Sequence, residues 1–135
     1  MTLPPLSTQI VGSWSKPQWL ADHELVYGEE GTWWRVAPEH LAEAQDDAVR
    51  LAVSDQQRAG LTIVGDGEQS RQHFVHGFLE QVEGIDFEHK VKMGIRDNRY
   101  EAEVPTVVGP IRRKGPVHAA EAMAARAHTK HQLQF

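Results

Sequence analysis

A long helical segment that leads directly into a short apolar run constrains the fold of this chain more than any other feature. Residues 38–59 begin at Pro38, which suits the first position of a helix, and end before Gly60, which suits a left-handed cap. Their apolar residues recur at the spacing of one helical face: Leu41, Ala44, Ala48, Leu51 and Ala52. Residues 61–65 then form an apolar, β-branched run, as in strands of parallel sheets that are buried on both faces.

A second apolar run, at residues 9–12, lies before the helix and stops at a glycine and a serine. The order is therefore strand, helix, strand, and two such strands in one sheet are parallel and joined by a right-handed connection. We predict an α/β fold, with a helix at 69–82, a β-hairpin at 85–108 that turns at residues 97–98, a helix at 117–128 and the start of a strand at 132–135.

The connection between the first strand and the long helix, residues 14–37, has no clear period and holds all four tryptophans: Trp14, Trp19, Trp33 and Trp34. A connection of this length is usually functional or disordered, and four large aromatic side chains argue against disorder. Two compatible interpretations follow. The tryptophans pack the segment onto the body of the protein, or the segment covers a substrate as a lid.

Composition excludes several classes of protein. The 14 basic and 19 acidic residues give a net charge of −5, which argues against nucleic-acid binding. The sequence has no run near 20 apolar residues and no leader-like start, so we expect a cytoplasmic protein. The absence of cysteine excludes disulfides, thiolate nucleophiles and cysteine-liganded zinc within these residues.

Candidate binding residues follow the two predicted strands. Parallel strands bring their carboxyl ends to one edge of the sheet, where ligands bind in α/β folds. Ser13, Asp66 and Glu68 are therefore expected to face one pocket. Two interpretations of the acidic pair stay open at this point: Asp66 caps the following helix and Glu68 complements its dipole, or the Glu68 carboxylate holds the ammonium group of a ligand.

Several segments, in order along nearly the whole chain, resemble the cobalamin-independent methionine synthase family in its catalytic barrel domain. They are residues 10–14 (IVGSW), 51–61 (LAVSDQQRAGL) and 64–71 (VGDGEQSR). The match extends to residues 74–79 with 83–87, 108–111 and 127–129.

The resemblance implies a TIM (β/α)8 barrel that transfers a methyl group from a methyl-tetrahydrofolate to homocysteine, giving methionine, with a zinc ion that activates the thiol. It implies that Val11, Gly12 and Ser13 contact the amino-acid part of homocysteine and that Glu68 holds its amino group. Asp66 is shared with shorter members of the family, and the resemblance gives it no role. No residue of this chain is implied as catalytic or as a metal ligand.

The family's zinc ligands, a histidine, cysteines and a glutamate, lie on later strands, and a complete barrel needs about 250 residues. We therefore expect one domain over residues 1–135, the N-terminal part of an incomplete barrel with an inserted β-hairpin. We also expect no zinc-dependent methyl transfer from these residues alone, and self-association through open strand edges. Two alternatives are a half-barrel remnant without catalytic activity and a related thiol alkyltransferase of the coenzyme M type.

Overall fold

The computed structural model describes residues 3–25, 33–72 and 76–135. The chain divides into two compact units, a first unit of residues 1–72 with 118–135 and a second unit of residues 73–117. The single domain expected over residues 1–135 stays a prediction. In the described part of the chain, the two hairpin strands are hydrogen-bonded to each other and to no other strand.

The first unit is built around helix α1 (Pro38–Arg58), close to the predicted bounds of 38–59. Its buried face consists of Ala48, Val49, Ala52, Val53 and Gln56. Leu51, expected on this face, is 47% exposed. The prediction for Leu51 was wrong because the face is set by what packs against it, and the stripe through Val49 and Val53 is the one that meets the core.

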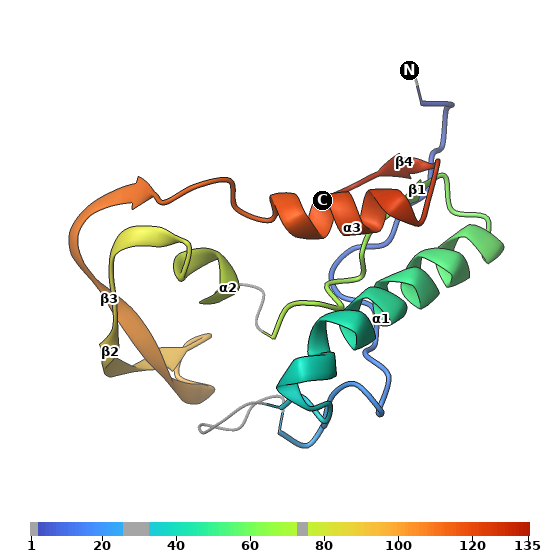
Figure 1. Cartoon of the computed structure of the whole chain (residues 1–135). Helices are drawn as coiled ribbons and strands as arrows, with labels where there is room; N and C mark the ends of the chain where they lie inside the picture. Colours follow the sequence, from blue (N-terminus) through green and yellow to red (C-terminus); the bar gives the residue numbers. More distant parts are fainter. Residues whose placement is uncertain (1–2, 26–32, 73–75) are drawn as a thin grey trace. The chain divides into compact units, whose positions relative to one another are not determined.

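Strands β1 (Ile63–Val64) and β4 (Gln132–Leu133) pair in parallel, with Ile63 opposite Gln132 and Val64 opposite Leu133. Both are shorter than the predicted ranges 61–65 and 132–135. Helix α3 (Ala119–Ala127) lies just before β4 in the sequence and packs against α1, as Figure 1 shows. The core between these elements consists of Val49, Val53, Val64 and Ala125, with Leu133 packed against it.

The strand predicted at residues 9–12 is not formed. The preceding residue, Thr8, accepts a backbone hydrogen bond from Ile63 N–H at 3.0 Å, and Thr8 and Thr62 exchange bonds through their hydroxyl groups at 3.3 and 3.4 Å. Residues 9–12 form no further backbone pairs with β1, and Val11 is 93% exposed. An apolar run therefore lies beside β1 without the repeated backbone pairing that defines a strand.

The helix predicted at 69–82 is also mostly absent. Residues 67–70 form a turn, residues 73–75 lie outside the described residues, and α2 is a single helical turn (His76–Leu79). Gly67 and Glu68, with positive φ angles of 65° and 56°, open this turn, and the turn takes up residues 69 and 70, where the helix was expected to begin. At the other end, Val82 already pairs with Arg113 in the hairpin.

The second unit is an antiparallel hairpin of β2 (Val82–Ile95) and β3 (Tyr100–Arg113), longer than the predicted 85–108. Three consecutive residues with positive φ, 96 to 98, make the turn. One face of the outer half is apolar and consists of cross-strand pairs: Val91 with Val104, Met93 with Ala102, and Ile95 with Tyr100. The architecture is thus mixed α/β, and none of the helices among the described residues has the length and apolar character needed to cross a membrane.

Candidate functional site

A cavity of about 110 Å³ lies where β1 and β4 end, within the first unit. The residues that follow the two strands form its walls, together with part of the segment that runs beside β1. Its lining consists of Ile10, Gly12, Gly65, Asp66, Gly67, Glu68, Arg71, Gln134 and Phe135. The position agrees with the general preference of parallel α/β folds for ligands at the carboxyl ends of strands.

Three of the five residues predicted to bind substrate line this cavity: Gly12, Asp66 and Glu68. Val11 and Ser13 are exposed and are not among the lining residues. The segment that carries Ser13 nevertheless meets the segment that carries Glu68, because the N–H of Trp14 donates to the carbonyl oxygen of Gly67 at 3.0 Å.

Gly67 makes this close meeting of segments possible. A Cβ at this position would lie 2.7 Å from the Cβ of Trp14 and 3.2 Å from that of Ala52. Gln69 joins the same two segments, since its Nε2 donates to the carbonyl oxygens of Trp14 at 2.9 Å and Gly67 at 3.1 Å. Gln69 is buried, so these hydrogen bonds hold the two segments together away from water, where hydrogen bonds are stronger.

Gln56 holds the end of β1 from the helix side. Its Oε1 accepts the N–H of Gly65, and its Nε2 donates to the carbonyl oxygens of Gly65 and Ala52, all at 2.9 Å. The side chain is fully buried. Its amide group takes the place of a neighbouring strand, which would otherwise bind the backbone N–H and carbonyl oxygen of Gly65. Sequence reasoning missed this role, although a glutamine in register with the buried stripe of α1 is an available signal.

An ion-pair cluster occupies one wall of the cavity. Arg71 Nη2 donates to Asp66 Oδ2 at 2.9 Å, and both side chains are largely buried, 14% and 5% exposed. Arg71 Nη1 lies 3.8 Å from Glu68 Oε1, and the guanidinium carbon lies 4.8 Å from the centre of the Phe135 ring. Arg71 was not singled out from the sequence, although it follows the acidic pair within the same segment.

Lys16 brings a second positive charge to this region from the tryptophan-rich segment. Its Nζ lies over the Trp33 ring, 5.0 Å from the centre. Burial lowers the pKa of the Lys16 ammonium below its ordinary value, and the negative charges of Glu68 and Asp66 offset this effect only in part. The lining of the cavity thus combines two carboxylates with the guanidinium of Arg71, an arrangement suited to a ligand that carries charge of both signs.

The tryptophan-rich segment is anchored where it is described. Trp33 is buried, Ala21 and Trp34 form an isolated antiparallel bridge, and Asp22 N–H donates to the Trp33 carbonyl oxygen at 2.9 Å. These contacts favour the packing interpretation for Trp33, whereas Trp19 is exposed. Residues 26–32 lie outside the described residues, and a lid role stays a prediction.

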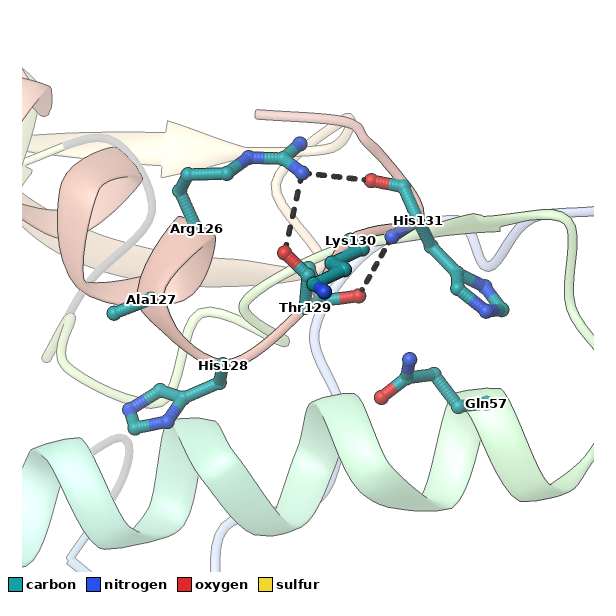
Figure 2. A pocket seen from close by; sticks show the side chains of 7 residues that line it. All are labelled: Gln57, Arg126, Ala127, His128, Thr129, Lys130 and His131. Atoms are coloured by element: carbon teal, nitrogen blue, oxygen red, sulfur yellow. Dashed lines mark hydrogen bonds between the residues drawn. The ribbon is translucent and has the colours of Figure 1, made fainter.

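A larger hollow of about 840 Å³ lies between α1 and the segment that joins α3 to β4 (Figure 2). Several of its polar groups are hydrogen-bonded within the first unit. Arg126 Nη1 donates to the carbonyl oxygens of Thr129 at 3.2 Å and His131 at 2.9 Å, and His128 Nε2 lies 2.8 Å from Asp46 Oδ1 on α1. These bonds close the end of α3 and join it to α1, which is a structural role.

Comparisons with known proteins show which family this chain resembles. A sequence model described as "Cobalamin-independent synthase, Catalytic domain" matches residues 6–134. The methionine synthases of Sulfolobus acidocaldarius and Sulfurisphaera tokodaii are 32% and 31% identical to this chain over 90% and 93% of its length, and over 34% and 35% of their own.

A solved B12-independent methionine synthase from Shewanella sp. W3-18-1, in complex with selenomethionine, is 43% identical. The two structures match with a TM-score of 0.77, and the match covers 95% of this chain and 36% of the solved synthase. The chain thus spans about a third of the length of the proteins that it matches.

Proposed function

Because this chain belongs to the cobalamin-independent methionine synthase family, by way of its catalytic domain, we propose that it binds the amino-acid part of homocysteine in the cavity beside Glu68. The observation that carries the proposal is that Gly12, Asp66 and Glu68 line one cavity at the ends of β1 and β4. The Glu68 carboxylate accepts hydrogen bonds from the substrate ammonium group, and Gly12 offers backbone that no side chain covers.

In this proposal, Val11 and Ser13 flank Gly12 and contribute backbone groups to the same amino-acid part. Support for Ser13 comes from the bond between Trp14 and Gly67, which brings its segment to the turn that carries Glu68. The 43% identical synthase with selenomethionine supports the choice of ligand, because selenomethionine is the selenium analogue of the methylated product.

The reaction that we propose for the complete catalytic domain is transfer of a methyl group from a methyl-tetrahydrofolate to the sulfur of homocysteine. The fold that we propose is the amino-terminal part of a (β/α)8 barrel, with the hairpin β2–β3 inserted between its strands. It is supported by the parallel pairing of β1 with β4 and by the match to about a third of the solved synthase.

Zinc, which the family uses to activate the thiol, has no fitting ligand set here. The described residues contain no group of three or more histidine, aspartate or glutamate side chains able to hold a metal, and the sequence has no cysteine. We therefore assign these residues to substrate binding alone.

Calorimetric titration of the 135-residue chain with L-selenomethionine tests the proposal. We expect Glu68→Gln to weaken binding about 10- to 100-fold, since a neutral amide oxygen replaces the charged acceptor of the ammonium group. Glu43→Gln, on the exposed side of α1, is the matched control and is expected to bind like the parent. Absence of binding to the parent, or equal affinity of the Glu68→Gln variant and the parent, would overturn the proposal.

A further inference from the structure

Glu68 adopts a backbone conformation that a residue with a Cβ rarely takes. Its φ is +56° and follows the +65° of Gly67, so two consecutive residues lie in the left-handed region. The backbone N–H of Glu68 donates to Asp66 Oδ1 at 3.0 Å, and its carbonyl oxygen accepts the N–H of Arg71 at 3.2 Å. Both ends of the unusual residue are therefore held by residues of the same turn.

Asp66 is the residue on which this turn depends. Its side chain is 5% exposed, and its two oxygens are engaged by different partners, Oδ1 by the Glu68 N–H and Oδ2 by Arg71 Nη2. Arg71 is in turn stacked on the Phe135 ring and lies nearer to Asp66, at 2.9 Å, than to Glu68, at 3.8 Å.

We propose that Asp66 and Arg71 are positioning residues that keep the Glu68 carboxylate directed at the cavity and available to a ligand ammonium group. This inference rests on the proposed function. Asp66 holds the Arg71 guanidinium at 2.9 Å, so that Arg71 orients the Glu68 carboxylate from 3.8 Å without closing onto it. Because both Asp66 oxygens already bind donors of the chain, Asp66 acts through Glu68 and does not itself hold the ligand.

A double-mutant cycle tests this order of action. Asp66→Asn keeps the size and the Oδ1 acceptor but removes the charge that holds Arg71. We expect it to weaken L-selenomethionine binding roughly tenfold in the parent background and less than about twofold in the Glu68→Gln background. Asp47→Asn is the matched control, since Asp47 forms an exposed aspartate–arginine pair with Arg50 on α1 and is expected to leave affinity unchanged.

The ligand itself provides a second discrimination. The analogue that lacks the amino group, 4-(methylseleno)butyrate, offers nothing to Glu68, so Asp66→Asn should leave its binding, measured by competition, unchanged. Arg71→Lys keeps a positive charge beside Asp66 without the planar fork, and we expect it to retain more affinity than Arg71→Met. Equal losses for Asp66→Asn in both backgrounds, or equal losses for ligands with and without the amino group, would overturn the positioning role.

A measurement without ligand separates this inference from the proposed function. Asp66→Ala removes the acceptor of the Glu68 amide, and we expect exchange of that amide with solvent, followed by NMR, to accelerate about tenfold or more, while Asp66→Asn retains protection. If Asp66→Ala does not fold, Asp66→Glu displaces the oxygen and serves the same purpose. Failure of selenomethionine to bind the parent removes the proposed function, whereas unchanged Glu68 exchange in Asp66→Ala or Asp66→Glu removes the positioning role.

Discussion

Replacement of Gln56 by methionine tests how the end of β1 is held. The two side chains have similar length and volume, so the substitution removes the amide group with little change in packing. Gly65 would lose the partners of both its N–H and its carbonyl oxygen, each at 2.9 Å in the structure. The carbonyl oxygen of Ala52 keeps its ordinary helical donor and is not orphaned.

The expected loss follows from these two groups. A buried backbone group without a partner costs about 1–3 kcal/mol, and Gly65 is only partly buried, which favours the lower half of that range. The free energy of unfolding should therefore fall by about 2–4 kcal/mol for the two groups together, measured by urea denaturation followed by circular dichroism. Amide exchange at Gly65 should accelerate in parallel.

The neighbouring residue gives a matched control. Gln57 is half-buried at the rim of the larger hollow, and we expect Gln57→Met to change the free energy of unfolding by less than about 0.5 kcal/mol. A Gln56→Met variant as stable as the parent, or equal losses for both variants, would refute the view that the Gln56 amide replaces a missing strand partner.

Three further predictions concern single positions. Gly67→Ala should destabilise the chain by about 2 kcal/mol or more in urea denaturation, because its Cβ would lie 2.7 Å from a tryptophan Cβ, whereas Gly115→Ala meets open space and serves as the control. The backbone N–H and ring of His89, with the N–H of Glu88, hold the pKa of Asp86 below its usual 3.8. The stabilisation by the charged Asp86 carboxylate is present above pH 3.8 and is lost as the pH falls through its folded pKa. The difference in free energy of unfolding between the parent and Asp86→Asn, measured by urea denaturation, should therefore shrink in acid. Met93→Lys should reduce concentration-dependent association in sedimentation by charging the exposed apolar face of the hairpin, while Lys92→Gln should not; a parent that stays monomeric would contradict this.

The long helix α1 was predictable because its signals are local. Pro38, the apolar spacing and Gly60 all act within the segment itself. The same information misplaced Leu51, because the buried face also depends on α3, which packs against the helix from a distant part of the chain.

The predictions of a strand at residues 9–12 and of a helix at 69–82 failed for physical reasons of the same kind. An apolar run at residues 9–12 does not specify a hydrogen-bonding partner, and only the neighbouring Thr8 finds one on β1. Where a helix was predicted from residue 69, the chain instead continues the turn of residues 67–70, in which the Asp66 side chain accepts the N–H of Glu68.

The rule about strand ends predicted that Ser13, Asp66 and Glu68 face one pocket. Asp66 and Glu68 line the cavity, whereas Ser13 does not and the strand before it is not formed, so the binding role of these residues stays a prediction. The contributions of Arg71 and Gln56 required the structure. Arg71 reaches Asp66, five residues earlier, only because of the shape of the turn between them, which was not predicted. The side-chain amide of Gln56 binds Gly65, which lies outside the helix that carries Gln56.

The parallel pair β1–β4 joins residues about 70 positions apart in the sequence, whereas α1 and the β2–β3 hairpin are closed by contacts between near neighbours. Closing so long a loop is entropically costly and slow, so the local elements should form first and the parallel pair last. The cavity lies where β1 and β4 end, and its walls come together only in that final step. A ligand that binds in the cavity therefore stabilises only the chain in which β1 and β4 have paired. Its binding thus indicates that this last folding step has taken place.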